Sequence, residues 1–220
     1  MSEREFSAVL FDFGGVITTS PFDAFQQFER EQGLPGGFIQ SVNRANPDTN
    51  AWAQFERGEL DEAEFDEAFA RESRSAGHEI RGMRVVELVY GQVRPQMVNA
   101  VKTCREGYVT ACLTNNFRQR HLPAGESNRA DNERNEREWR DALALFDEVI
   151  ESSKLGVRKP EPAFFELACS KLAIEPAKAV FLDDLGTNLK PAKAMGMYTI
   201  KVADPDEALA ELSSVLGLDL

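Results

Sequence analysis

Short, continuous apolar runs recur along the chain, and segments in which apolar residues return every three or four positions separate them. A continuous apolar run is typical of a strand that is buried on both faces of a sheet. The runs cover residues 7–12, 108–114, 146–150, 179–183 and 197–202. Helical spacing is clearest over residues 95–105, 162–172 and 185–195. Because strands that alternate with helices form parallel sheets, the pattern predicts an α/β protein with a doubly wound, Rossmann-like parallel sheet.

Residues 20–92 break this alternation, because aromatic residues there recur at helical spacing without any convincing strand. These aromatic residues are Phe22, Phe25, Phe28, Trp52, Phe55, Phe65 and Phe69. Ser20 and Pro21 suit the N-cap and first position of a helix. We interpret the segment as an all-helical cap over the carboxyl edge of the sheet, with the aromatics packing its helices together. The predicted domains are a core of residues 1–19 and 93–220 and a cap of residues 20–92.

The segment from Arg118 to Asp141 is rich in Arg, Glu, Asn and Asp, and Trp139 is its only aromatic residue. Its six Arg and six acidic residues nearly cancel, so it is not a basic nucleic-acid arm. The composition predicts a long polar loop beside the site entrance, followed by a helix around residues 138–145.

Composition narrows the classes of partner. The chain has 220 residues, of which 42% are hydrophobic and 28% charged, as in an ordinary globular protein. Its 25 basic and 37 acidic residues give a net charge of −12, which argues against nucleic acid and anionic membranes as partners. No run reaches the ~18 apolar residues of a spanning helix, and the first residues lack the apolar core of a secretory signal. The three cysteines form no C-x-x-C pair, and we expect reduced thiols in a cytoplasmic protein.

Polar residues stand where the predicted strands end, and one lysine precedes the second of the three clear helices. They are Asp12, Thr114, Asn115, Lys159, Asp183 and Asp184. Because the carboxyl ends of parallel strands face one crevice, we expect these side chains to meet there. An aspartate oxygen can attack phosphorus and form an acyl phosphate, and paired carboxylates can hold a divalent cation. Thr114 and Lys159 could then hold the phosphoryl oxygens, so the site would supply the positive charge that the acidic chain lacks.

Four segments carry a resemblance to a known family: VLFDFGGVIT (9–18), LTNN (113–116), KLGVRKPEPAFFELA (154–168) and FLDDLGTNLKPAKAMGM (181–197). Over nearly its whole length the chain resembles the haloacid dehalogenase-like hydrolase superfamily. It looks most like the N-terminal phosphatase domain of soluble epoxide hydrolase and the hydrolase-like domain fused to some acyl-CoA dehydrogenases. The family places a helical cap after the first motif, in agreement with the helical pattern of residues 20–92.

The resemblance implies a role for each motif residue. Asp12 matches the nucleophile and a Mg²⁺ ligand, and Thr114 matches the phosphate-binding hydroxyl of the second motif. Asn115 beside it is expected to contact substrate. Lys159 matches the lysine that stabilises the nucleophile and the phosphoryl oxygens.

The fourth motif is expected to hold the cation. Asp184 matches its metal ligand, and Asp183 supports that ligand directly or through water. Asn188, one helical turn further on, is expected to orient Asp184 or Lys159 by hydrogen bonding.

The first motif departs from the family pattern at Gly14, where phosphatases of the family usually carry an aspartate. A glycine keeps the backbone carbonyl that coordinates Mg²⁺ but removes the side chain that protonates the leaving group. That proton transfer is worth roughly 10²–10⁴-fold in rate. Activated substrates such as acyl phosphates need it least. The freedom of glycine at a turn offers a second, conformational reason for its presence.

These observations predict a Mg²⁺-dependent phosphatase of small phosphorylated metabolites that acts through an aspartyl phosphate. A non-catalytic module that binds phosphorylated ligands is the alternative, and a haloacid dehalogenase is less consistent with the acid pair. Nothing in the pattern indicates an oligomeric state. The residues considered as substitutes for the missing acid are His78, His121, Asp23 and Glu56.

Overall fold

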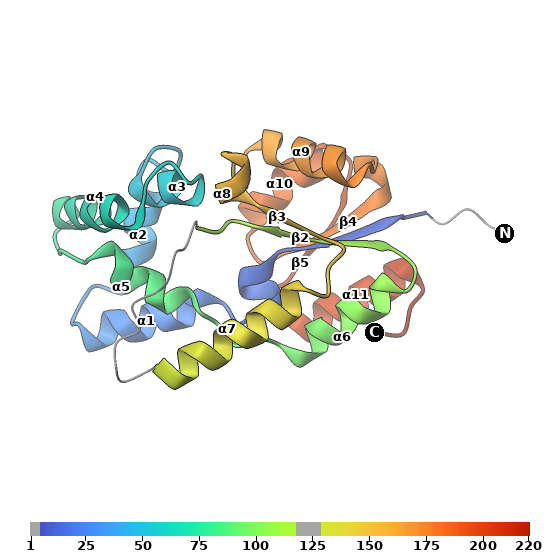
Figure 1. Cartoon of the computed structure of the whole chain (residues 1–220), viewed down its shortest axis with the longest axis horizontal. Helices are drawn as coiled ribbons and strands as arrows, with labels where there is room; N and C mark the ends of the chain where they lie inside the picture. The colour runs from blue at the N-terminus through green and yellow to red at the C-terminus, as the bar shows by residue number, and fades with distance from the viewer. Residues whose placement is uncertain (1–4, 118–128) are drawn as a thin grey trace.

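The computed structural model describes residues 5–117 and 129–220, which form a parallel sheet flanked by helices, with a further helical layer at one edge (Figure 1). The sheet has five strands in the order β3-β2-β1-β4-β5, all parallel. They are β1 (Ala8–Phe11), β2 (Val109–Thr114), β3 (Glu148–Glu151), β4 (Ala179–Asp183) and β5 (Tyr198–Lys201). Every strand predicted from the apolar runs is present.

The register of the sheet brings the predicted site residues to one level. Phe11 at the end of β1 pairs with Cys112 of β2 and with Leu182 of β4. The backbone N–H of Asp12 donates to the carbonyl of Leu182 at 2.8 Å, so Asp12 and Asp183 leave their strands side by side. Adjacent carboxyl ends of this kind are where open α/β sheets bind ligands.

Helices cover both faces of the sheet (Figure 1). Below it in the figure lie α6 (Pro95–Arg105), α7 (Arg129–Leu143) and α11 (Pro205–Leu216). Above it lie α8 (Ser152–Leu155), α9 (Pro162–Leu172) and α10 (Gly186–Ala194), with a 3₁₀ turn over Pro176–Lys178 leading into β4. Two hydrophobic clusters follow, because Val9 and Phe11 point to one face and Ala8 and Leu10 to the other.

The remaining helices lie between β1 and β2 in the chain and form a layer beside the carboxyl edge of the sheet (Figure 1). They are α1 (Pro21–Glu31), α2 (Phe38–Arg44), α3 (Ala51–Glu56), α4 (Glu62–Ser75), α5 (Gly82–Val86) and a 3₁₀ turn (Glu87–Val89). Their aromatic residues pack into a third hydrophobic cluster, as predicted, and Ser20 caps α1 through a hydrogen bond to the N–H of Phe22. The two connecting segments run antiparallel, with a bridge between Thr18 and Val93.

The prediction of a polar loop up to residue 138 is wrong for the second half of that segment, because α7 already begins at Arg129. Trp139, Ala142 and Leu143 pack against the sheet and stabilise this helix, whereas the turns before Trp139 carry few apolar residues. A helix whose first half is polar has the composition of a loop, which explains the error. Residues 118–128 lie outside the described part of the chain.

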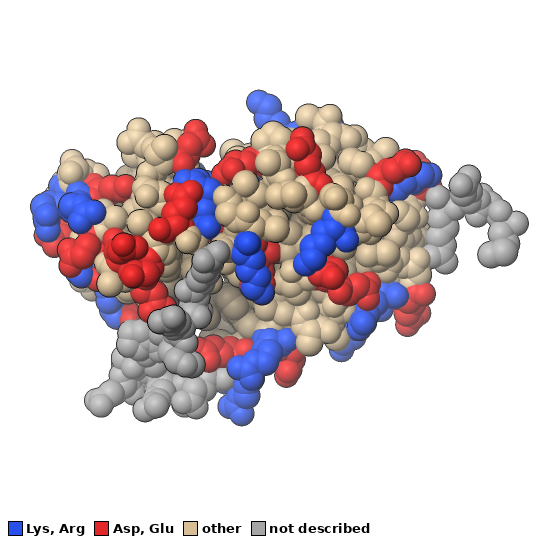
Figure 2. All heavy atoms as spheres, turned by 45° about the horizontal axis from the view of Figure 1, so that its top comes forward, with Lys and Arg blue, Asp and Glu red and all other residues tan. Residues whose placement is uncertain are grey.

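Three further findings concern membrane spans, surface charge and the cysteines. Within the described residues, no helix has both the length and the apolar character that a membrane span requires. On the face drawn in Figure 2, acidic and basic side chains are interspersed. Cys104, Cys112 and Cys169 are free and buried, and burial raises the pKa of the Cys104 thiol to about 12.

Candidate active site

Asp12 stands at the tip of β1, where the chain leaves the sheet through a tight turn over Phe13–Ile17. Its side chain is buried, and Oδ1 accepts hydrogen bonds from the Phe13 N–H at 2.7 Å and from Lys159 Nζ at 2.7 Å. Both contacts fall on Oδ1, so Oδ2 is the oxygen oriented for other partners. Burial raises the pKa of Asp12, and the negative charge of Asp183 raises it further, whereas Lys159 opposes both effects.

Lys159 is the cation at the centre of the cluster. Its side chain is only 1% exposed, and Nζ lies 2.7 Å from Asp12 Oδ1 and 2.8 Å from Asp183 Oδ2. Burial alone would lower the pKa of Lys159, but the two carboxylates outweigh it and hold this pKa above its ordinary value. Lys159 is therefore a fixed positive charge rather than a proton donor near neutral pH.

Asp183 is held by three donors besides its place at the end of β4. Its Oδ1 accepts from the Leu185 N–H at 2.8 Å, and Asn188 Nδ2 lies within 3.1 Å of both carboxylate oxygens. The third donor is Lys159 Nζ. Asn188 comes from the first turn of α10, so this helix fixes Asp183, and Asp183 in turn fixes the lysine.

Asp12, Asp183 and Asp184 form a group of carboxylates, and one oxygen from each lies within 4.8 Å of the other two. Burial, together with the negative charge of Asp183, raises the pKa of Asp184 to about 6. Lys159 and Arg94, whose charge also acts on Asp184, do not balance three carboxylates, and hard cations such as Mg²⁺ prefer clustered carboxylate oxygens. The donor set therefore fits Mg²⁺. Because Asn188 already donates to Asp183, the carboxylates available to the ion are those of Asp12 and Asp184.

The two glycines of the first motif, Gly14 and Gly15, lie in different structural environments. Gly15 has φ +79°, and a Cβ atom there would lie 2.2 Å from Asp184 Oδ2. Gly14 has an ordinary extended conformation (φ −69°, ψ 128°), and nothing lies within 4 Å of where its Cβ would be. A conformational requirement therefore explains Gly15 but does not explain Gly14.

Thr114 and Asn115 follow β2 but have different surroundings. Thr114 is half-buried and lines the cavity described below. The Asn115 amide clamps the backbone of Lys159, since Oδ1 accepts from the Lys159 N–H at 2.9 Å and Nδ2 donates to its carbonyl at 2.9 Å. Nδ2 also donates to Glu56 Oε2 at 3.2 Å, so both hydrogens of this amide are used. The side chain expected to contact substrate instead holds the lysine.

A cavity of about 780 Å³ is lined by Gly14, Thr114 and Asn115, which come from the same loops as the cluster. The four charged residues of the cluster, Asp12, Lys159, Asp183 and Asp184, are not among its lining residues. Most of its remaining wall is apolar and comes from Phe13, Trp52, Val89, Tyr90, Phe117, Trp139, Leu143 and Val149. The charged lining residues are Glu56, Glu136, Arg140, Glu151 and Lys154.

Trp139 organises one wall of this cavity. Its ring stacks on Tyr90 at 4.8 Å and meets Phe13 edge-on at 4.9 Å, and Nε1 donates to the Gly91 carbonyl at 2.8 Å. In the sequence, Trp139 is the single aromatic residue of the polar segment 118–141. That isolation is the signal that could have marked it as a functional residue.

The family model for haloacid dehalogenase-like hydrolases matches residues 6–196. The chain belongs to this family. It is 36% identical to mouse acyl-CoA dehydrogenase family member 10 and 30% identical to mouse bifunctional epoxide hydrolase 2, over 99% and 94% of its own length. The chain spans 20% and 38% of the length of these two relatives. It is also 26% identical to a sesquiterpene phosphatase of Aspergillus oryzae, with 96% of this chain and 97% of that protein covered.

Solved structures support the fold of this haloacid dehalogenase-like hydrolase. One is a family enzyme from Bacteroides thetaiotaomicron in complex with magnesium and inorganic phosphate. It superposes with a TM-score of 0.57 at 18% identity, over 89% of this chain and 93% of that one.

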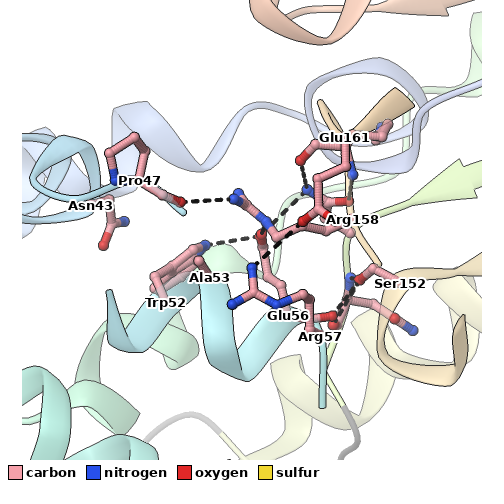
Figure 3. Close-up of polar contacts among 12 residues, drawn as sticks. Asn43, Pro47, Trp52, Ala53, Glu56, Arg57, Ser152, Arg158 and Glu161 are labelled. Atoms are coloured by element: carbon pink, nitrogen blue, oxygen red, sulfur yellow. Dashed lines mark hydrogen bonds and ion pairs between the residues drawn. The ribbon is translucent and has the colours of Figure 1, made fainter. Parts of the chain in front are cut away.

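The structure also places the residues considered as substitutes for the missing acid at Gly14. Asp23 is exposed in the first turn of α1, and His78 is exposed and meets the Phe38 ring edge-on. His121 lies outside the described residues. Of the three candidates in the described part of the chain, Glu56 is the one that lines the cavity. Its carboxylate accepts hydrogen bonds from Arg158 Nε and Trp52 Nε1 (Figure 3). It also accepts one from Asn115 Nδ2, so both of its oxygens are already engaged.

Proposed function

We propose that this hydrolase is a Mg²⁺-dependent phosphatase of small phosphorylated metabolites and acts through an aspartyl phosphate on Asp12. The observation that carries the proposal is the position of Lys159 Nζ, 2.7 Å from Asp12 and 2.8 Å from Asp183, in a cluster with Asp184. This arrangement orients one aspartate and concentrates charge where a phosphoryl group needs it. The name of the full-length Aspergillus relative, a phosphatase, supports the same chemistry.

The chemical steps follow from the side chains. In the first, Asp12 Oδ2 attacks phosphorus, the new O–P bond forms, and the bond from phosphorus to the leaving-group oxygen breaks with its electron pair going to that oxygen. An alcohol leaving group then takes its proton from solvent water, whereas an acyl phosphate releases a carboxylate that needs none. In the second, a water oxygen attacks phosphorus and gives up a proton to solvent, the aspartyl O–P bond breaks with its electron pair returning to Asp12, and inorganic phosphate leaves. Lys159 holds the Asp12 carboxylate in place and stabilises the charge on the phosphoryl oxygens, together with the Thr114 hydroxyl and the Asn115 backbone N–H.

Mg²⁺ fits the site through Asp12, Asp184 and the Gly14 carbonyl. When bound, it supplies Lewis-acid stabilisation of the phosphoryl oxygens and offsets repulsion between carboxylate and phosphate. Asp183 supports these ligands by fixing Lys159, and Asn188 supports Asp183.

Two features of the site bear on the leaving group of the substrate. Gly14 leaves open the space of the family's acid, so the leaving group departs without a proton from that position. The cavity next to Gly14 is walled by Phe13, Tyr90, Trp139 and other apolar side chains, which favours an apolar leaving group. We therefore propose phosphate monoesters of apolar alcohols, and activated phosphates such as acyl phosphates, as substrates. Residues 20–92 act as the cap over this cavity, in a cytoplasmic protein.

Phosphate release from a substrate panel tests the proposal. The panel contains farnesyl phosphate, p-nitrophenyl phosphate, acetyl phosphate and the polar ester glycerol 3-phosphate, each assayed with Mg²⁺ and with EDTA. The matched control is Asp12→Asn, which keeps the shape of the side chain and removes the nucleophile. We expect Mg²⁺-dependent release from the apolar and activated substrates that Asp12→Asn abolishes. Wild-type activity no greater than that of Asp12→Asn on the whole panel contradicts the proposal.

A further inference from the structure

Glu56 is a buried carboxylate that reaches from the cap layer into the core. It is the last residue of α3 and is 7% exposed. In Figure 3 its side chain points between Trp52 of its own helix and Arg158, and Ser152 lies beside the end of the helix. A buried charge needs partners, and those partners come from loops that carry the candidate active site.

Three donors converge on the carboxylate. Oε2 accepts from Arg158 Nε at 2.5 Å and from Asn115 Nδ2 at 3.2 Å, while Oε1 accepts from Trp52 Nε1 at 2.9 Å. Arg158 also donates to the Pro47 carbonyl at 3.2 Å, so it is held by the cap at two points. An amide in place of this carboxylate would turn its NH₂ group toward one of the donors, so Glu56→Gln loses at least one of these hydrogen bonds.

Two of these donors, Arg158 and Asn115, adjoin Lys159 in the core. Arg158 precedes the lysine directly, and Asn115 holds its backbone N–H and carbonyl at 2.9 Å each. The lysine must keep Nζ between Asp12 and Asp183 for the cluster to exist. Glu56 therefore binds the sequence neighbour of Lys159 and the amide that clamps its backbone.

A second contact joins the same helix end to the core. The Glu56 carbonyl accepts from Ser152 Oγ at 2.6 Å, and that hydroxyl oxygen accepts from the Asn116 N–H at 3.0 Å. The end of α3 is thus tied through its backbone to the segment after β2 and through its side chain to the segment before α9. The first segment directly follows Thr114, the last residue of β2, and the second carries Lys159.

We propose that Glu56 is a positioning residue through which the docking of α3 sets the position of Lys159. It acts through Asn115 and Arg158 and takes no part in proton transfer. The turnover test rests on the phosphatase function proposed above, whereas the position of the two loops can be measured without it.

The test compares Glu56→Gln with the matched control Glu59→Gln in the full chain. Glu59 lies three residues further on, is half-exposed and pairs with Arg57, so its substitution removes no hydrogen bond to Asn115 or Arg158. With acetyl phosphate as a small substrate, we expect kcat of Glu56→Gln to fall about tenfold or more while KM changes less than about threefold. Glu59→Gln should match the wild type.

Two readouts report loop position directly. The chain has two tryptophans, so the Trp52 indole N–H resonance is readily assigned by comparison with Trp52→Phe, and Glu56→Gln should shift it. Amide hydrogen exchange should accelerate over residues 113–117 and 157–161 in Glu56→Gln but not in Glu59→Gln. Arg158→Lys is the second variant, to be used if Glu56→Gln fails to fold. It cannot reproduce the Nε contact, so amide exchange should accelerate over the same two segments.

The outcomes separate the two proposals. If the wild type turns over substrate and the folded variant keeps kcat within about twofold, Glu56 does not position Lys159 and the inference is overturned. If the wild type hydrolyses nothing, the proposed function fails, and the exchange data alone decide about Glu56. Unchanged exchange in both loops then overturns the inference, and accelerated exchange supports it.

Discussion

Gly15 and Asp184 are packed so closely that a Cβ atom on Gly15 would lie 2.2 Å from Asp184 Oδ2. Gly15 also has φ +79°, which L side chains adopt only at a cost. Both facts make Gly15, rather than Gly14, the glycine that the fold requires. The carboxylate of the predicted metal ligand rests directly on the turn that follows the predicted nucleophile.

Replacing each glycine by alanine tests this relationship. Gly15→Ala should displace Asp184 and weaken Mg²⁺ binding, and its positive φ should lower the free energy of unfolding by about 1–2 kcal/mol. Gly14→Ala has an extended backbone and open space, so it should fold and bind Mg²⁺ as the wild type does. Isothermal titration with Mg²⁺ and thermal melts measure both effects. Equal losses in the two variants would contradict the assignment.

Gly14→Asp should restore the acid that the family's phosphatases usually carry, because the structure leaves room for a side chain there. We expect kcat for an unactivated ester such as farnesyl phosphate to rise about tenfold or more, since general-acid catalysis helps poor leaving groups most. Acetyl phosphate, whose leaving group needs little protonation, should change much less. Gly14→Asn controls for size. An unchanged rate on the unactivated ester would show that proton transfer from this position does not limit turnover.

The Asp184 carboxyl predicts a specific pH dependence of Mg²⁺ stabilisation. Its pKa is raised from 3.8 to about 6, so between these values the folded protein holds a proton that the unfolded chain has lost. This group therefore makes the metal-free protein less stable as pH rises through that window. Mg²⁺ binds the deprotonated form, so the increase in Tm on adding Mg²⁺ should be small at pH 5 and larger at pH 7.5.

Calorimetric melts with Mg²⁺ and with EDTA at both pH values measure this difference. Asp184→Asn is the control, and its Tm should respond little to Mg²⁺ at either pH. A Tm increase in the wild type that is the same at pH 5 and pH 7.5 is the result that this account does not allow.

Substitutions of Trp139 test the proposal that the substrate has an apolar leaving group. Trp139 stacks on Tyr90 and lines the cavity, so Trp139→Ala should raise KM for farnesyl phosphate about tenfold through lost apolar contact. KM for acetyl phosphate, which is too small to reach this wall, should stay near the wild-type value. Trp139→Phe keeps an aromatic ring and loses the hydrogen bond to Gly91, and should fall between the two. A parallel rise for both substrates would indicate a general disturbance of the site instead.

The parts of the fold that were predicted well carry strong local signals. Helices α6 and α9 begin at Pro95 and Pro162, because proline suits the first helical position, and both were predicted to the residue. Helix α7 was predicted too short, since its first half has no apolar face and its stability comes from Trp139 and the residues after it.

Long-range contacts could not be predicted from local patterns. Glu56 meets Arg158 across 102 positions of the chain, and no local pattern signals that contact. The same holds for Asn115, whose place after β2 indicates proximity to the site but not that its amide clamps Lys159.

Trapping the phosphorylated enzyme tests directly whether Asp12 is the nucleophile. Wild type, Mg²⁺ and acetyl phosphate are mixed, quenched in acid within milliseconds and digested, and peptide mass spectrometry locates any phosphoryl group. We expect an acid-stable, hydroxylamine-labile phosphoryl group on Asp12 that is absent with EDTA and in Asp12→Asn. Turnover of acetyl phosphate without any phosphorylated Asp12 under these conditions, or a phosphoryl group on another residue, would contradict it.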